Sequence, residues 1–153
     1  MKNKNHFLSS AFIFIMLLCS TSSCNKKNAV FSKELERKFE RIEINKTFSL
    51  DTIQNEEWTH FCIVLPYMNL DSLIIANGIK CKEEDLLELK SLTMSDNINT
   101  LLFLMDNTLK RTEILSRSIA DFSDIVQIHS IIFERKQTLM INNDRSVSIS
   151  KDF

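Results

Sequence analysis

The chain has 153 residues, with 19 basic and 20 acidic side chains and a formal net charge of −1 at pH 7. This balance provides no basic surface for a nucleic acid, and we expect no nucleic-acid partner. Since the chain contains one glycine and one proline, it lacks the glycine-rich loops that hold phosphates and dinucleotides, and the many tight glycine turns typical of β-sandwiches and barrels.

In chain order, the first feature is an apolar run at residues 7–18, which follows Lys2 and Lys4 and leads into small residues before Cys24. A positive head, a short apolar core and small residues at the exit are the parts of a secretory signal peptide. A helix that spans a bilayer needs ~20 apolar residues. A permanent membrane span is therefore the weaker interpretation.

The tetrapeptide TSSC at residues 21–24 resembles the lipobox of bacterial lipoproteins, in which small residues directly precede a cysteine. The resemblance implies cleavage before Cys24, a diacylglyceryl thioether on its sulfur and acylation of the freed amine. Thr21 departs from the family pattern, which usually has leucine or a similar aliphatic residue there. The alternatives are an ordinary cleaved signal peptide, with Cys24 left as a free or disulfide-bonded thiol, and an uncleaved anchor.

We expect a signal peptide at residues 1–23, a lipidated Cys24 with a polar tether at 24–29, and one globular domain at 30–153. Two or more acyl chains hold a protein stably at a membrane, since each buried methylene contributes about 0.8 kcal/mol. The acidic run that some bacteria use to send lipoproteins to the outer surface does not follow Cys24. We therefore expect a location in the cell envelope, on the outer membrane and facing the periplasm.

The first part of the domain is predicted to contain a helix, a short strand and a buried central strand. Residues 31–44 have the period of an amphipathic helix, and residues 47–53 alternate like a short strand. Residues 58–65 predict a strand that is apolar on both alternations after His60, which indicates a central strand covered on both faces. Proline and tyrosine at positions 66 and 67 end this strand, because proline cannot continue the ladder.

A short helix is predicted at residues 69–77, with Gly78 as the left-handed residue beyond its end. A weak helical pattern at residues 83–92 predicts another helical turn or two. The remaining segments predict a hairpin at 99–105 and 109–116, a strand at 125–134, and two last strands at 138–141 and 146–150. Together these segments predict an α+β domain with an antiparallel sheet of about five strands. The N-terminal helix and the second short helix are expected to pack on one side of this sheet.

Trp58 opens the central strand and Pro66-Tyr67 closes it, and Asp121-Phe122 follows the hairpin. This order resembles a group of small bacterial lipoproteins of unknown function over part of the mature chain. The resemblance implies no activity, because the group has no established one. Trp58 and Tyr67 flank the central strand, where they either pack into the core or mark a binding patch.

Cys62 and Cys81 either form a disulfide, which an exported compartment permits, or remain a buried thiol and a half-exposed thiol. His60 and Cys62 share a strand face, but a closed zinc site needs four ligands, so we favour packing and expect no metal or cofactor. A Cys62–His129 nucleophile–base pair is the catalytic alternative. Burial among apolar neighbours makes such a thiol inert.

The anchor, the small size and the missing catalytic constellation favour a non-catalytic lipoprotein that binds another protein in the envelope, for example an inhibitor or immunity factor. We expect no enzymatic activity. The alternatives are a structural or assembly accessory of the outer membrane and a small thiol or metal hydrolase.

Overall fold

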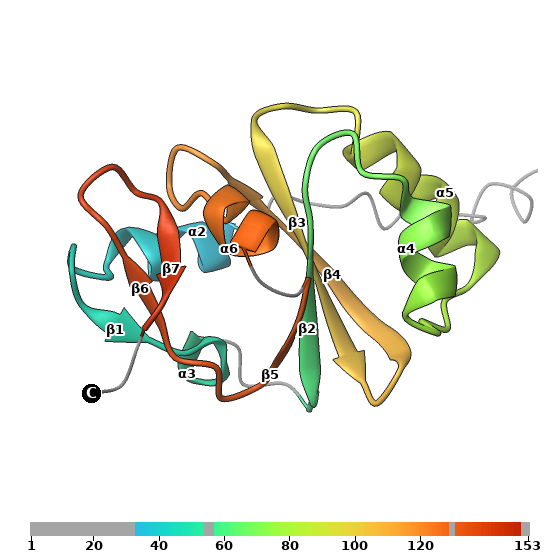
Figure 1. Ribbon diagram of the computed structural model, residues 1–153, viewed down its shortest axis with the longest axis horizontal. Helices are drawn as coiled ribbons and strands as arrows, with labels where there is room; N and C mark the ends of the chain where they lie inside the picture. The colour runs from blue at the N-terminus through green and yellow to red at the C-terminus, as the bar shows by residue number, and fades with distance from the viewer. Residues whose placement is uncertain (1–32, 54–56, 129–130, 151–153) are drawn as a thin grey trace, which may run out of the picture.

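Five helices and seven strands make up the part of the chain that the structure describes, residues 33–53, 57–128 and 131–150 of a computed structural model (Figure 1). The helices are α2 (Lys33–Glu40), α3 (Leu50–Ile53), α4 (Leu70–Ala76), α5 (Glu83–Leu92) and α6 (Ser123–Ile128). The strands are β1 (Thr47–Phe48), β2 (His60–Val64), β3 (Ile98–Met105), β4 (Thr108–Ser116), β5 (Ile132–Glu134), β6 (Leu139–Ile141) and β7 (Val147–Ile149). The predicted signal peptide, Cys24 and the tether lie outside the described residues.

The strands form two antiparallel sheets. Strands β4, β3, β2 and β5 lie side by side in that order in one sheet, and β1, β6 and β7 form the other. The predicted α+β class is confirmed, but the prediction of a single larger sheet is wrong. Leu139, Ile141 and Val147 of β6 and β7 are buried in the main core, so these short strands cover that core and do not extend the four-stranded sheet.

Strand β2 lies in the interior of the four-stranded sheet, where β3 pairs with one edge and β5 with the other. Phe61 and Ile63 pack into the main core on one face, whereas Cys62 and Val64 pack into a second core on the opposite face. Burial on both faces explains the unbroken apolar run in the sequence. The prediction of a central strand is therefore confirmed.

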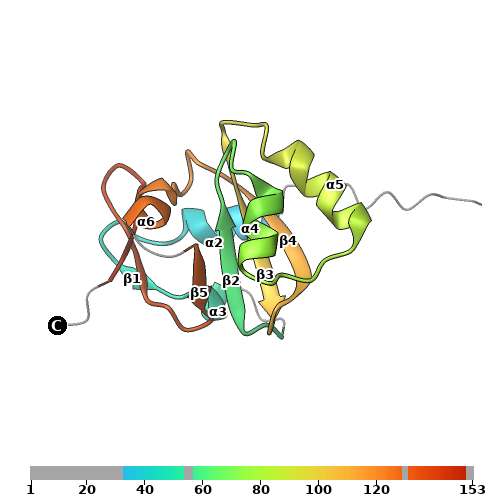
Figure 2. The ribbon, with the colours of Figure 1, turned by 45° about the vertical axis from the view of Figure 1, so that its right-hand side comes forward.

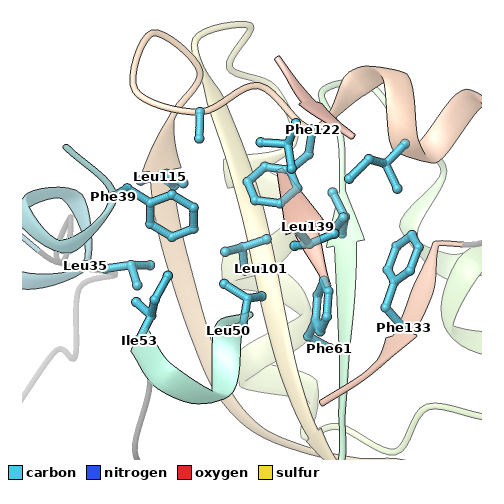
Figure 3. Packing of buried hydrophobic residues seen from close by; sticks show 14 of the residues in the cluster. Leu35, Phe39, Leu50, Ile53, Phe61, Leu101, Leu115, Phe122, Phe133 and Leu139 are labelled. Atoms are coloured by element: carbon cyan, nitrogen blue, oxygen red, sulfur yellow. The ribbon is translucent and has the colours of Figure 1, made fainter. Parts of the chain in front are cut away.

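The main core fills the space between the four-stranded sheet and the layer of α2, α3, α6 and the three-stranded sheet (Figure 3). Phe61 of β2 stacks on Phe133 of β5 with the ring centroids 5.2 Å apart. Phe39 of α2 meets Phe122 edge to face at 6.1 Å. Such ring pairs contribute about 0.5–1.5 kcal/mol beyond the burial of their area, so the aromatic residues join elements that are distant in sequence.

Helices α4 and α5 cover the opposite face of the four-stranded sheet (Figures 1 and 2). Leu70, Leu73 and Leu89 are their buried residues, and they pack in the second core with Cys62 and Leu102. The prediction that the helices lie on one side of the sheet is wrong. Because β2 and β3 are apolar on both alternations, each face of the sheet needs its own cover.

Residues 47–53, predicted as one strand, divide into β1 and the helix α3. Leu50 and Ile53 are both buried and lie three residues apart, which is a helical spacing. The Thr52 N–H and hydroxyl both donate to the Ser49 carbonyl, at 3.3 and 2.7 Å. These local hydrogen bonds compete with the strand and turn the chain.

Residues 125–134, also predicted as one strand, divide into the end of α6 and the short strand β5. The Asp121 carboxylate accepts hydrogen bonds from the Ser123 N–H at 3.0 Å and from its hydroxyl at 2.6 Å. Local bonds of this kind favour the start of a helix. They outweigh the preference of Ile125 and Val126 for a strand.

The predicted hairpin is confirmed as β3 and β4, with Asp106 in a left-handed conformation at the turn (φ 53°). The first predicted helix is confirmed as α2, although it ends at Glu40 and not at residue 44. Leu35 and Phe39 are its buried residues, as the helical period predicts.

Candidate functional site

Cys62 is fully buried in β2, and burial raises the pKa of its thiol to about 12. At neutral pH the thiol stays protonated, so it is a poor nucleophile and a poor metal ligand. Its candidate base, His129, lies outside the described residues. Cys81 is half-buried before α5, and burial together with the charge of Asp85 raises the pKa of its thiol as well. Both cysteines are free thiols.

The imidazole Nδ1 of His60 lies 3.0 Å from the hydroxyl of Thr59, its neighbour in sequence. Within residues 33–53, 57–128 and 131–150, three or more histidine, cysteine, aspartate or glutamate side chains do not gather where they could hold a metal ion. A metal ion bound by His60 and Cys62 would therefore find no further ligands in this part of the chain.

Trp58 is a core residue, at 2% exposure. Its ring meets those of Phe61 and Phe103 edge to face, at 6.1 and 5.0 Å between centroids. The guanidinium of Arg135 lies 5.1 Å from the indole centroid and donates to the Trp58 carbonyl at 3.1 Å. Of the two alternatives for Trp58, packing into the core is confirmed, because the sheet and the Arg135 side chain enclose the indole.

Tyr67 is exposed, at 64%. It follows Pro66 in a turn that the Met68 N–H closes onto the Leu65 carbonyl at 3.4 Å. The φ of Tyr67 is +60°. A turn with proline at its second position and a positive φ at its third is of type II and favours glycine or asparagine there. Tyrosine in this conformation costs about 1–2 kcal/mol, so the fold holds an exposed aromatic ring at a strained position.

The strained turn is tied to the end of α5. The Tyr67 N–H donates to the Thr93 carbonyl at 2.7 Å. A hydrogen bond with the Asp96 carboxylate, together with slight burial, raises the pKa of the Tyr67 phenol. The start of α4 therefore lies beside the end of α5.

Both ends of α4 carry caps. The Asn69 side chain accepts a hydrogen bond from the Ser72 N–H at 3.0 Å and so caps the start of the helix. Gly78 has a φ of +61°, and its N–H donates to the Ile75 carbonyl at 3.2 Å. The next N–H, of Ile79, donates to the carbonyl of residue 74 at 3.0 Å, which completes a Schellman motif. The predicted role of Gly78 is confirmed.

Helix α5 begins at Glu83 without a side-chain cap, and its first turn carries three acidic residues, which interact favourably with the helix dipole. Leu89 is its buried residue, with Leu86 and Leu92 packed against the second core. Leu87 lies on the outer side and is exposed. The helix thus has apolar residues on both its inner and its outer sides, which explains its weak amphipathic pattern.

An ion pair joins α4 and α5. The Lys90 Nζ lies 2.9 Å from the Asp71 carboxylate. The two helices run in opposite directions (Figure 1). Ile75 is one turn beyond Asp71 and Leu87 about one turn before Lys90, which places them about 6 and 4.5 Å along the two axes from the ion pair. Ile75 and Leu87 therefore lie at a similar level along the helix pair.

We call Tyr67, Ile75, Leu87 and Met94 the helix-pair strip. The Tyr67 N–H is hydrogen-bonded to the carbonyl of Thr93, and Met94 is the next residue. Tyr67 and Met94 therefore lie on the other side of the Asp71–Lys90 ion pair from Ile75 and Leu87. Ile75 is 79% exposed, Leu87 65% and Met94 69%. Among the described residues, Ile44 is the one further large hydrophobic side chain that is exposed, at 44%. Four of the five large hydrophobic side chains that are exposed in the described residues thus lie on α4, α5 and the turns beside them.

The sequence predicted one member of this strip, Tyr67, and missed Ile75, Leu87 and Met94. The available signal was an apolar residue on the polar side of a helical pattern. Ile75 follows Leu73 and Ile74 in α4, and Leu87 follows Leu86 in α5, so each extends an apolar run beyond the inward positions. The position of α4 beside α5, which brings these residues into one region, is a property of the fold.

Among the described residues, no helix has the length and hydropathy needed to cross a bilayer. The apolar run at residues 7–18 lies outside them. No known protein-family model, no curated protein and no solved structure matches this chain.

Proposed function

We propose that this protein is a membrane-anchored bacterial lipoprotein of the cell envelope whose domain binds another protein and performs no catalysis. The observation that carries the proposal is the helix-pair strip, which holds four of the five exposed large hydrophobic side chains of the described residues. A clustered apolar surface with a polar rim is typical of a protein-binding site. The buried, protonated thiol of Cys62 supports the non-catalytic part.

The anchor in this proposal is Cys24, acylated after cleavage of residues 1–23, on the outer membrane and facing the periplasm. An extended chain spans at most ~3.3–3.6 Å per residue, so the segment from Cys24 to Lys33 can reach about 30 Å. The domain then works close to the membrane, where its partner is another envelope protein.

The anchor is tested by mass spectrometry of the mature N-terminus. We expect a chain that begins at Cys24 and carries the mass of a diacylglyceryl group and an N-acyl group, in wild type and in Cys19→Ser. The Cys24→Ser variant should lose both lipid groups. A wild-type chain that is unprocessed, lipid-free and found in the cytosol would refute the proposed anchor.

The binding function is tested with a soluble Cys24→Ala form immobilised and exposed to envelope extract. We expect one stoichiometric partner that is retained by wild type and lost by the double variant Ile75→Ser, Leu87→Ser. Ile44→Ser is the matched control, because it removes an exposed isoleucine far from the strip and should retain the partner. A partner that all three proteins retain equally contradicts the role of the strip.

A further inference from the structure

The helix-pair strip lies in the most acidic part of the described chain. Residues 67–97 carry six acidic and three basic side chains, whereas residues 33–53 carry five of each. Within the first of these segments, Lys90 is paired with Asp71, which leaves five acidic side chains and two basic ones, Lys80 and Lys82. The charge of the surface around the strip is therefore negative.

The carboxylates flank the strip at both ends. Glu83 and Glu84 are exposed about one turn before Leu87 on α5, and Asp96 is exposed beside the phenol of Tyr67. The helix dipole accounts for acidic residues in the first turn of α5, where they contribute about 0.3–1 kcal/mol each. It does not account for the exposed leucine between those acids and the ion pair.

We propose that the helix-pair strip docks a basic amphipathic segment of a partner protein. This proposal rests on the protein-binding function proposed above and adds the chemistry of the partner. Apolar side chains of the partner contact Ile75 and Leu87, and its lysine or arginine side chains face Glu83 and Glu84. Charge complementarity of this kind accelerates association and rejects acidic partners.

The other end of the strip suits the same partner. Tyr67 presents a large, rigid ring of the kind enriched in interface hot spots, and its exposed face can stack with an arginine guanidinium. Met94 has a flexible thioether side chain that adapts its shape to a contacting surface. Asp96 beside the ring then faces the charge of that arginine.

A membrane surface fits this face less well than a basic protein segment. Bacterial anionic headgroups are repelled by carboxylates and attracted by lysine and arginine clusters. Helices α4 and α5 also lie on the face of the four-stranded sheet opposite to α2, the first described helix after the tether segment (Figure 1). Both observations favour a protein as the occupant.

The experiment uses residues 24–153 with Cys24→Ala, which contain every described element. The probes are two amphipathic peptides of equal length, one of lysine and leucine and one of glutamate and leucine, and vesicles that contain phosphatidylglycerol. Backbone amide shifts locate the binding site. We expect the lysine–leucine peptide to bind with shifts in residues 67–97, more weakly as salt is added, and the other two probes to bind at least tenfold more weakly.

Substitutions then separate the apolar and the charged contributions. Ile75→Ser with Leu87→Ser should weaken peptide binding by about 30-fold or more, as for hot-spot residues. Glu83→Gln with Glu84→Gln should weaken it by about two- to five-fold for each carboxylate removed. Asp124→Asn, which neutralises an exposed first-turn carboxylate of α6, is the matched control and should leave binding unchanged.

The proposal is overturned if the glutamate–leucine peptide or the anionic vesicles bind as tightly, if the shifts lie outside residues 67–97, or if Asp124→Asn weakens binding as much as the Glu83, Glu84 pair. The envelope partner gives an independent result. A partner lost by the apolar double variant but retained at full affinity by Glu83→Gln with Glu84→Gln overturns the basic chemistry and leaves the protein-binding function standing. If no envelope partner depends on the strip, the protein-binding function itself is refuted.

Discussion

Tyr67 provides a test of backbone strain in which glycine and alanine should exchange their usual order of stability. The φ of Tyr67 is +60°, a conformation that costs a residue with a Cβ about 1–2 kcal/mol. Glycine does not bear this cost, although its greater freedom in the unfolded chain offsets about 0.5–1 kcal/mol of the gain. Both substitutions remove the tyrosine ring, so the loss of its contacts is the same in the two variants and cancels when their stabilities are compared. We expect Tyr67→Gly to be more stable than Tyr67→Ala by about 1 kcal/mol.

The measurement is urea unfolding of the soluble Cys24→Ala form carrying each substitution. Leu87→Gly and Leu87→Ala are the matched controls, because Leu87 is equally exposed and lies within α5. There glycine should be the less stable of the two by about 1 kcal/mol. If glycine is also the less stable residue at position 67, the strain attributed to the turn is absent and the reasoning is refuted.

This result bears on why a tyrosine occupies the turn. Both Tyr67 variants should retain the fold, since the ring is mostly exposed, and both should bind the partner more weakly. Strained positions persist where they serve a function that a relaxed residue cannot perform. A chain that gives up stability to present this ring to solvent is consistent with a binding role for the helix-pair strip.

Three further predictions concern other parts of the domain. At pH 8 a thiol reagent should label Cys81 in the folded protein and both Cys81 and Cys62 in denaturant, because burial raises the pKa of Cys62 to about 12; labelling at equal rates contradicts this. Gly78→Ala should destabilise the protein by about 1 kcal/mol through its φ of +61°, since the added Cβ meets the nearest side-chain atom at an ordinary 3.7 Å; urea unfolding measures it. Burial would raise the pKa of Asp121, but hydrogen bonds from Arg117 and Ser123 and the Arg117 charge hold it below its usual value. The stability from this group is present above the unfolded pKa of about 3.9 and is lost as the pH falls toward the folded pKa, so Asp121→Asn should show a shallower loss of stability below pH ~4.

The elements that the sequence predicted well are those whose pattern has one dominant cause. The predicted strand at residues 58–65 is apolar on both alternations after His60 because β2 is buried on both faces. Gly78 provides the left-handed residue that ends α4. In each case local preference and tertiary burial favour the same structure.

The errors lie where a local hydrogen bond or a distant contact decides between two plausible structures. Ser49 and Asp121 turn their following segments into short helices although the apolar residues there suit a strand. The division into two sheets depends on which strands meet, and alternation within each strand carries no information on its partner. Trp58 was ambiguous because a large aromatic residue at a strand end suits both core and surface.

The geometry of the helix pair also determines how a binding role can be tested without unfolding the protein. The inner face of the pair is held by Leu70, Leu73 and Leu89 in the second core, and by the caps of α4. The helix-pair strip takes no part in that packing, because its side chains are exposed. Truncating a buried leucine costs about 2–5 kcal/mol, whereas an exposed substitution is usually within about 0.5 kcal/mol. A loss of binding on changing Ile75 and Leu87 can therefore be assigned to the contact with the partner, provided that the unfolding midpoint stays where it was.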